Sequence, residues 1–455
     1  MSALNLAFST SPVKSAPITW IVDDDGPADF HTLQEAIGGV NTGDTIFVKN
    51  GTYREHVTIN KNVLLVGESA EATIIDGSYV GNVVEVTASN VAIIGFTIRN
   101  SGEQWTDGGI ALNHVNNCNI SRNKITANKG HGIRLYTSSN NKIIGNSIIA
   151  NNWGGIWVST YANHNRISGN NIIANTGNGV WLDASTNNSV IGNNIVDNND
   201  GIALCGPWNN TITGNNVTAN HGDGIRLISS PDNRIFHNNF IENQQSVHTW
   251  MSYRNLWDDG YPSGGNYWSD YTDVDNYRGQ YQNETGSDGI GDAPYIIDGN
   301  NTDNYPLMGM FYNYNVPYVE KGLSVNIISN STVSNFILGI SIQPPTNGSF
   351  SFNVTSIGFY VTGETGIGFC QICIPTALMN DPCIVFVNGT EVPYTLLPCS
   401  NMTHKYLYFT YNHSTKEVVI AVPEFPLLSI LLLFAMATLI AVIVYRRKHC
   451  TMTHE

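Results

Sequence analysis

Two tryptophans, Trp157 and Trp181, occupy the same position in successive copies of a short Gly-Ile or Gly-Val motif. Each follows an aliphatic residue that is expected to point inward, so each indole ring is expected to point outward. Their column in the aligned copies reads Ala111, Arg134, Trp157, Trp181, Ala203, Arg226. Exposed aromatic rings with hydrogen-bonding neighbours suit the apolar faces of sugar rings. The column therefore predicts a surface that binds a polysaccharide or surface glycan.

The column two positions further along adds Tyr136 and Asp183, whose side chains can exchange hydrogen bonds with sugar hydroxyls. The predicted ligand-binding residues are Arg134, Tyr136, Trp157, Trp181, Asp183 and Arg226. The alternative is that the rings serve packing, covered by a loop or by the C-terminal domain.

A second group of candidate residues lies in a glycine-rich segment near residue 280. Asp273, Asp275, Asp288 and Asp292 offer the hard oxygen ligands that Ca²⁺ prefers. The spacing differs from that of an EF-hand, because Arg278 stands where the turn glycine belongs. The segment predicts a Ca²⁺ site, with solvated acidic turns as the alternative.

Both groups belong to a chain with internal repeats. The Gly-Ile motifs recur every 22 to 24 residues, at Ile110, Ile133, Ile156, Val180, Ile202 and Ile225. Two asparagine columns keep the same register: Asn123, Asn146, Asn170, Asn193, Asn215, Asn238, and Asn128, Asn151, Asn175, Asn198, Asn220, Asn243. Three columns in one register indicate a solenoid.

Each repeat consists of three short strand-like segments separated by polar turns. Inward aliphatic residues would stack on their counterparts one coil away, at a spacing of about 4.8 Å. The asparagines fall at the bends, where their amides can form ladders from coil to coil. A leucine-rich horseshoe is excluded because the repeat has no helical segment. The sequence predicts an all-β, right-handed parallel β-helix, a solenoid like that of pectate lyase, over residues 20–245.

Both ends of such a stack need caps. The segment Thr32-Leu33-Gln34-Glu35 is a capping box, which predicts a helix over the N-terminal end. Residues 246–316, rich in Trp, Tyr, Gly and Asp, are predicted to form the C-terminal cap.

Residues 20–311 resemble the NosD-type β-helix family, within the wider group of carbohydrate-binding and sugar-hydrolase β-helices. The resemblance rests on residues 22–26 (VDDDG), 43–46 (GDTI), 50–53 (NGTY), 90–98 (NVAIIGFTI), 264–270 (GGNYWSD) and 288–292 (DGIGD). It is specific for the fold and says little about function. The family name implies copper, but no cluster of His, Cys and Met is visible in the sequence.

Gly130-His131-Gly132 resembles a motif of the polygalacturonases, which hydrolyse galacturonan on this fold. Their mechanism requires paired carboxylates, and the coils around His131 offer no aspartate pair. We therefore interpret His131 as a turn residue of the repeat.

Residues 317–422 form a separate region with alternating strand patterns, which predicts a small β-sandwich. It contains Cys370, Cys373, Cys383 and Cys399. Disulfides are favoured over zinc because the protein is expected to be exported. Four cysteines allow three connectivities, which the sequence does not distinguish.

Residues 427–445 are uncharged and apolar, long enough as a helix to span a bilayer. Arg446, Arg447 and Lys448 follow, so the positive-inside rule predicts one transmembrane helix with a cytoplasmic C-terminus. Residues 423–455 resemble the surface anchors of archaeal exported proteins. Residues 1–19 resemble the remnant of an export signal. The bulk of the chain is expected to lie outside the cell.

The chain has a net charge of −15, and apart from residues 446–448 its sequence contains no cluster of Lys and Arg that could neutralise phosphates. This excludes nucleic acid as a partner. These features predict a surface-anchored protein without catalytic activity that binds glycan or has a structural or adhesive role. One alternative is a polysaccharide lyase, hydrolase or epimerase. Another is a copper-handling accessory protein. A cluster of Asp, Arg and Lys in one groove would favour an enzyme, and an aromatic strip would favour binding.

Overall fold

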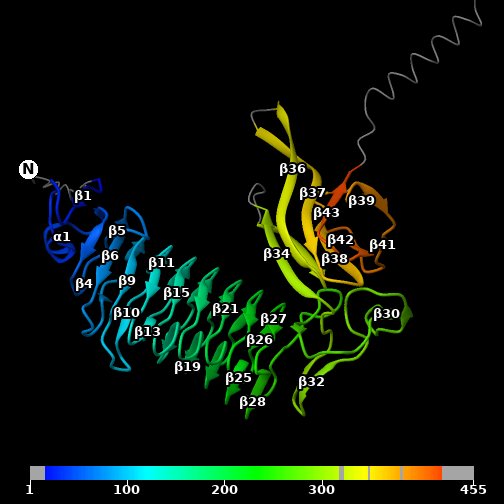
Figure 1. Ribbon diagram of the computed structural model, residues 1–455, viewed down its shortest axis with the longest axis horizontal. Coiled ribbons are helices and arrows are strands. Elements are labelled where there is room, and N and C mark those ends of the chain that lie inside the picture. Colours follow the sequence, from blue (N-terminus) through cyan, green and yellow to red (C-terminus); the bar gives the residue numbers. More distant parts are fainter. Residues whose placement is uncertain (1–15, 317–321, 347–348, 380–382, 423–455) are drawn as a thin grey trace, which may run out of the picture. The chain divides into compact units, whose positions relative to one another are not determined.

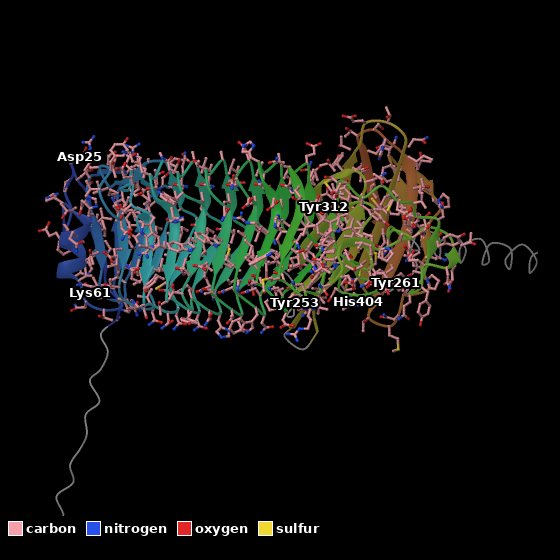
Figure 2. The ribbon with its side chains drawn as sticks, turned by 90° about the horizontal axis from the view of Figure 1, so that it is seen from below. Asp25, Lys61, Tyr253, Tyr261, Tyr312 and His404 are labelled. Carbon is pink, nitrogen blue, oxygen red and sulfur yellow. The ribbon has the colours of Figure 1, made fainter. Side chains whose placement is uncertain are left out.

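The computed structural model describes residues 16–316, 322–346, 349–379 and 383–422. Residue contacts divide the chain into two units between Phe311 and Tyr312. The first unit contains three long parallel sheets, and between residues 45 and 250 their strands follow one another in rotation along the chain (Figure 1). The predicted right-handed parallel β-helix is thereby confirmed. Figure 2 shows its coils succeeding one another from the N-terminal end, marked by Asp25 and Lys61.

The three sheets contain ten, ten and nine strands. The first sheet consists of β1 (Thr19–Val22), β2 (Thr45–Val48), β5 (Leu64–Gly67), β8 (Ala92–Ile94), β11 (Asn119–Ser121), β14 (Lys142–Ile144), β17 (Arg166–Ser168), β20 (Ser189–Ile191), β23 (Thr211–Thr213) and β26 (Arg234–Phe236). The second consists of β3 (Gly51–Tyr53), β6 (Thr73–Asp76), β9 (Thr97–Arg99), β12 (Lys124–Thr126), β15 (Ser147–Ile149), β18 (Asn171–Ile173), β21 (Asn194–Val196), β24 (Asn216–Thr218), β27 (Asn239–Ile241) and β29 (Tyr267–Trp268). The third consists of β4 (Val57–Ile59), β7 (Val84–Val86), β10 (Gly108–Asn113), β13 (His131–Tyr136), β16 (Ile156–Ser159), β19 (Val180–Asp183), β22 (Ile202–Cys205), β25 (Asp223–Ile228) and β28 (Gln245–Trp250).

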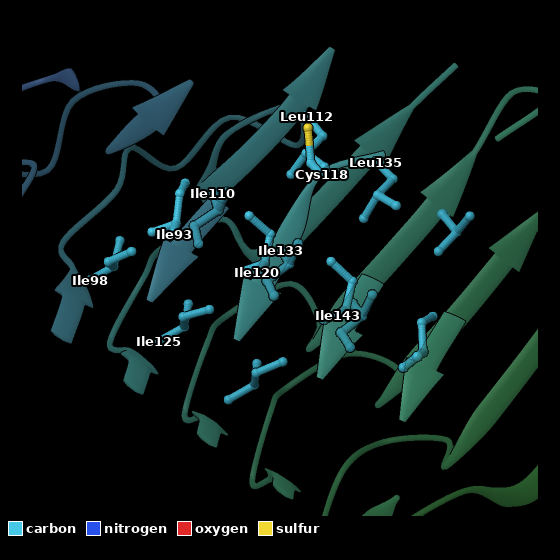
Figure 3. Packing of buried hydrophobic residues seen from close by; sticks show 14 of the residues in the cluster. Ile93, Ile98, Ile110, Leu112, Cys118, Ile120, Ile125, Ile133, Leu135 and Ile143 are labelled. Atoms are coloured by element: carbon cyan, nitrogen blue, oxygen red, sulfur yellow. The ribbon is translucent and has the colours of Figure 1, made fainter. Parts of the chain in front are cut away.

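The hydrophobic core runs along the axis of the coil as columns of aliphatic side chains. Ile93, Ile120 and Ile143 pair in register in successive strands of the first sheet, as Figure 3 shows. Ile110 and Ile133 form the equivalent column in the third sheet. All five are fully buried. The inward positions predicted from the repeat are therefore correct.

Asparagine ladders hold the bends. In the column through Asn146, Asn170 and Asn193, each side-chain Oδ1 accepts bonds from the backbone N–H and the Nδ2 of the preceding asparagine, at 2.9–3.0 Å. Each Nδ2 also donates to a backbone carbonyl, such as Asn170 to Ile143 at 2.8 Å. Both predicted columns form ladders, and the structure adds a third one: Asn141, Asn165, Asn188, Asn210, Asn233, Asn255.

The residue before each ladder asparagine adopts a left-handed backbone conformation. Gly145, Gly169 and Gly192 have φ values of 62–63° and precede Asn146, Asn170 and Asn193. Glycine reaches this region without steric cost. The recurrent Gly-Asn pairs in this column therefore reflect the geometry of one bend.

Asn170→Ala is expected to destabilise the β-helix by several kcal/mol. The change removes the acceptor shared by the backbone N–H and the side-chain N–H of Asn146, at a cost of about 1–3 kcal/mol for each buried donor, and it also removes one bond to the carbonyl of Ile143. Asn171→Ala is the matched control, because Asn171 is only partly buried and accepts one bond, from Asn194. Urea denaturation of both variants checks this; equal losses would contradict the role of the ladder.

The N-terminal end of the core is covered by α1 (Leu33–Gly39). Thr32 caps it by accepting a bond from the backbone N–H of Glu35, as the capping box predicted. The carboxylate of Glu55 accepts two further bonds, from the N–H groups of Leu33 and Gln34. Leu33 and Ile37 are fully buried against the first coil.

At the other end of the core, aromatic rings replace the aliphatic columns. Phe240 stacks on Trp268 with ring centroids 4.6 Å apart, and Trp268 stacks on Tyr295 at 4.7 Å. The buried carboxylate of Asp303 accepts a bond from the Trp268 indole N–H. The cap also contains two short hairpins: β30 (Tyr277–Arg278) with β31 (Glu284–Thr285), and β32 (Tyr295–Asp298) with β33 (Asn301–Asp303).

The second unit contains two five-stranded antiparallel sheets that share one buried core. One consists of β34 (Met310–Val316), β35 (Leu323–Ser329), β38 (Ile367–Pro375), β42 (His404–Asn412) and β41 (Thr395–Leu396). The other consists of β36 (Thr332–Thr346), β37 (Ser349–Thr362), β43 (Lys416–Ala421), β39 (Ile384–Val387) and β40 (Thr390–Val392).

The predicted disulfides of this unit are wrong. Cys370 and Cys373 of this unit are free thiols, as are Cys118 and Cys205 of the first unit. Cys370 is fully buried beside the hydroxyls of Ser329 and Tyr411, and Cys383 packs against the sulfur of Met379. Burial raises the pKa of Cys370 to about 11, which suits an inert thiol.

The predicted membrane anchor at 427–445 lies outside the described residues, as does most of the predicted export remnant. Within the residues that are described, no helix has the length and apolar character that crossing a bilayer requires.

Candidate functional site

The outward face of the third sheet holds the predicted tryptophan column. Trp157 in β16 pairs in register with Arg134 in β13 and with Trp181 in β19. The two indole rings stack with centroids 5.3 Å apart and planes 19° apart. This separation agrees with the predicted spacing of adjacent coils.

The expectation that both rings are exposed is wrong for Trp157, whose side chain is only 5% exposed. The ring of His131 stacks on it at 5.0 Å, and Trp105 packs against it at 5.4 Å. Trp105 belongs to residues 102–107, a turn between β9 and β10 that the repeat pattern does not define. Trp181 remains partly exposed.

A hollow of about 520 Å³ opens beside these rings. Its lining is mostly aromatic, with acidic and amide groups at the margin: Glu103, Gln104, Trp105, His131, Trp153, Trp157, Trp181, Asp183. We call this set the aromatic groove. A smaller hollow of about 170 Å³ adjoins it and shares His131, Trp153 and Trp181. Trp105 and Trp153 are 57% and 48% exposed, so their rings are accessible to a ligand.

His131 has a different place from the turn position that we inferred. It is the first residue of β13 and is 4% exposed. Burial, aided by the charge of Arg134, lowers the pKa of His131 to about 4, so the ring is neutral at physiological pH. Within the described part of the chain, Nδ1 of His131 and Nε1 of Trp157 are buried without a hydrogen-bond partner. A buried polar atom without a hydrogen-bond partner destabilises the folded state. These two atoms therefore mark a place beside the hollow where a bound group can supply a hydrogen bond.

Arg134 and Tyr136 lie together, but neither lines the aromatic groove. The Arg134 guanidinium lies 5.7 Å from the centre of the Tyr136 ring and donates to Asn113 at 3.0 Å. Asn113 in turn donates to Glu85 at 2.7 Å. Burial lowers the pKa of Arg134.

Arg226 is also separate from the groove. Its guanidinium pairs with Asp200 at 2.7 Å. The other carboxylate oxygen of Asp200 accepts a bond from the backbone N–H of Asp223 at 2.9 Å, and His248 lies 3.8 Å from the carboxylate of Asp223. Burial and the neighbouring charge of Asp200 raise the pKa of Asp223. The six predicted ligand residues thus fall into three places along one sheet, and only Trp157, Trp181 and Asp183 line the groove.

The lining residues that sequence reasoning missed are Glu103, Gln104, Trp105, His131 and Trp153. Trp153 and Trp105 stand in turns that vary in length between coils, so no column of the repeat contains them. The indole N–H of Trp153 donates to the carbonyl of Glu103, which ties these two turns together. The Gly-His-Gly motif was the available signal for His131.

The four aspartates of the predicted Ca²⁺ site accept hydrogen bonds from backbone N–H groups of their own segment. The carboxylate oxygens of Asp275 accept bonds from the backbone N–H groups of Asp288 and Gly289, and those of Asp292 accept from Asn276 and Tyr277. Asp288 likewise accepts from Gly279 and Ile290, and Asp273 is bonded to the N–H of Val274. Three of these aspartates therefore hold turns together across the segment.

Copper, which the family name implies, does not fit the described residues. The one group of three His, Cys, Asp or Glu side chains that converge within 4.8 Å there is Asp23, Asp24 and Asp25. Carboxylates alone are poor ligands for copper, which prefers His, Cys and Met.

Asp288 is expected to make the C-terminal cap more stable in acid than in base. Burial raises its pKa to about 6, so the native cap retains a proton that the unfolded chain releases near pH 4. This contribution is complete below pH 4 and is lost as the pH rises through 6. The whole contribution amounts to roughly 3 kcal/mol. Urea denaturation at pH 5 and pH 8, followed by tryptophan fluorescence, measures it.

Asp288→Asn should reduce this pH dependence and leave the part due to Asp275 and Asp303, because burial raises the pKa of each of them to about 7. Asp273→Asn, at an exposed position in the same segment, should leave the pH dependence unchanged. A chelator should leave the unfolding midpoint unchanged, because the carboxylates already accept backbone bonds. A midpoint that rises on addition of Ca²⁺ would contradict this assignment.

Two family models match the first unit. Residues 40–195 match the right-handed β-helix region, and residues 151–273 match the family described as periplasmic copper-binding protein (NosD). The chain belongs to the NosD-type right-handed β-helix family. Both matches lie within the first unit. The β-helix match includes every lining residue of the aromatic groove, and the NosD match includes Trp153, Trp157, Trp181 and Asp183.

Relatives among characterised proteins match short segments. The chain is 37% identical over 87 residues to pectinesterase/pectinesterase inhibitor 18 of Arabidopsis thaliana, covering 17% of this chain and 16% of that protein. It is 30% identical over 106 residues to pectinesterase 2 of Citrus sinensis, covering 20% and 21%. The chain thus spans about a sixth to a fifth of the length of these relatives.

Solved structures share the solenoid architecture at low identity. Pectate lyase Pel9A is 13% identical with a TM-score of 0.44, over 58% of this chain and 84% of that one. The periplasmic alginate epimerase AlgG is 18% identical with a TM-score of 0.27, over 48% and 71%. These likenesses concern the fold alone.

Proposed function

We propose that the protein binds a glycan chain in the aromatic groove. The observation that carries the proposal is the gathering of four tryptophans and a neutral histidine around one hollow, with the rings of Trp105 and Trp153 about half exposed. Exposed apolar rings of this size are unfavourable in water unless a ligand or partner covers them. Flat aromatic faces suit the C–H faces of sugar rings.

The polar residues of the groove can orient such a ligand. Glu103 and Asp183 offer carboxylate acceptors for hydroxyl groups, and Gln104 offers both a donor and an acceptor. The buried Nδ1 of His131 lacks a partner within the described residues, so a ligand hydroxyl can supply one. A few fixed polar groups within an apolar lining are typical of sites for small organic ligands.

The matched pectinesterases are named for a polysaccharide substrate, which agrees with a carbohydrate ligand here. Because the matched segments are short, their activity is not carried over to this chain. Binding without catalysis is favoured by the composition of the groove, which is mostly aromatic and has no Lys or Arg among its described lining residues.

A second candidate function is a polysaccharide lyase, hydrolase or epimerase. The observation that favours it is the cluster of Asp200, Asp223 and Arg226 on the same face of the third sheet, two coils beyond Trp181. A buried carboxyl group with a raised pKa, such as Asp223, is suited to general acid catalysis.

Trp153→Ala is expected to weaken glycan binding about five- to thirtyfold, since losing one stacked aromatic contact costs on the order of 1–2 kcal/mol. Trp208→Ala is the matched control, because Trp208 is 53% exposed and does not line the groove. Titration of tryptophan fluorescence with polysaccharides, using the full chain, measures both. Equal affinities of the two variants for the polysaccharides would contradict glycan binding in the aromatic groove.

Trp153 is a better test position than Trp157, whose removal would also open a cavity in a packed stack. The same polysaccharides, incubated with the parent and with Asp223→Asn, test for catalysis. Release of products by the parent and not by the variant would establish the enzyme instead of the binding protein.

We further propose that residues 427–445 anchor the protein in the membrane with residues 1–422 outside the cell. The apolar span and the basic cluster that follows it support this topology. Protease added to intact cells is expected to release fragments of the ectodomain while an epitope placed after residue 455 stays protected. Protection of both parts would rule the topology out.

A further inference from the structure

The charges around the aromatic groove are unevenly distributed. Glu103 and Asp183 line it, whereas no Lys or Arg is among the described residues that line either hollow. His131 adds no positive charge at neutral pH, because burial keeps its imidazole unprotonated. The groove is therefore anionic and walled by apolar rings, which weaken the screening of its charges.

Among the described residues, three basic side chains near the groove each have a polar or acidic partner. Arg134 is buried and bonded to Asn113, which is itself bonded to Glu85. Lys129 lies 3.7 Å from the carboxylate of Glu103 and 5.2 Å from the ring of Tyr79. Arg226 is paired with Asp200. Lys129 offsets part of the charge of Glu103, and Asp183 has no cation within ion-pair distance among the described residues.

From this arrangement we infer that the groove selects an uncharged glycan and discriminates against polyuronates. The inference rests on the proposed function and names its ligand class. Sugar hydroxyls can donate hydrogen bonds to Asp183 and Glu103 while the C–H faces of the rings stack on tryptophan. A uronate carboxylate can only accept, so beside Asp183 it would face another acceptor of the same charge. Specificity here arises from repulsion as much as from attraction.

The test uses the full chain and four probes: a mixed-linkage β-glucan and a mannan as uncharged polymers, and polygalacturonate and alginate as polyuronates. Binding is followed by tryptophan fluorescence at low and at high salt. The uncharged polymers are expected to bind at least tenfold more tightly at low salt. Salt should narrow the difference, because it screens the repulsion of polyuronates and leaves the binding of uncharged chains nearly unchanged.

Asp183→Asn is expected to raise the affinity for polyuronates relative to uncharged polymers by about tenfold. Asp197→Asn makes the same change in net charge at an exposed site, where Asp197 pairs with His221 outside the groove. It should leave the ratio of affinities unchanged. Melting curves for both variants establish that they are folded.

The outcomes separate the two proposals. Polyuronate binding by the parent at low salt that equals or exceeds binding of the uncharged polymers overturns the inference and leaves glycan binding in place. An unchanged ratio in Asp183→Asn also overturns it, because Asp183 is then not the source of selectivity. Failure of all four polymers to bind overturns the proposed function itself.

Discussion

Each ladder asparagine at a bend of the β-helix joins its own coil to the neighbouring coils through both ends of its amide. The oxygen accepts from the coil before it and the nitrogen donates to a backbone carbonyl, so the turn has few polar groups left to water. Such bonds form only when successive coils are in register. The aliphatic columns, the strand pairing and the position of every outward side chain on the third sheet depend on this register.

The sequence was sufficient to predict most of the β-helix, because its constraints repeat. Ile133, Ile156 and Val180 could be placed inside, and Trp157 and Trp181 next to each other, since a period near 23 residues and the alternation of strand side chains leave one arrangement. The helix at Thr32 followed from local capping chemistry. Both the register of the repeat and the helix cap depend on interactions between residues that are close in the sequence or one repeat apart.

The groove could be predicted only in part, because its walls come from residues outside the repeat. Nothing in the spacing of Trp105 or Trp153 shows that their turns fold over the third sheet and meet at the Glu103 carbonyl. The aspartates of the cap posed a different problem. Carboxylates among glycines suit either a cation or the N–H groups of tight turns, and the choice depends on backbone directions that composition does not contain.

The position of the groove along the stack has a consequence for its rigidity. Its residues come from β13, β16 and β19 and from the turns before β10 and β16, which are inner coils of the solenoid. In a structure whose coils contact only their neighbours, spontaneous opening starts at the ends and proceeds one coil at a time. Several coils must therefore unfold before the stacked rings of the groove are disturbed. The groove lies several coils from either end of the solenoid, so the caps unfold before the binding surface does.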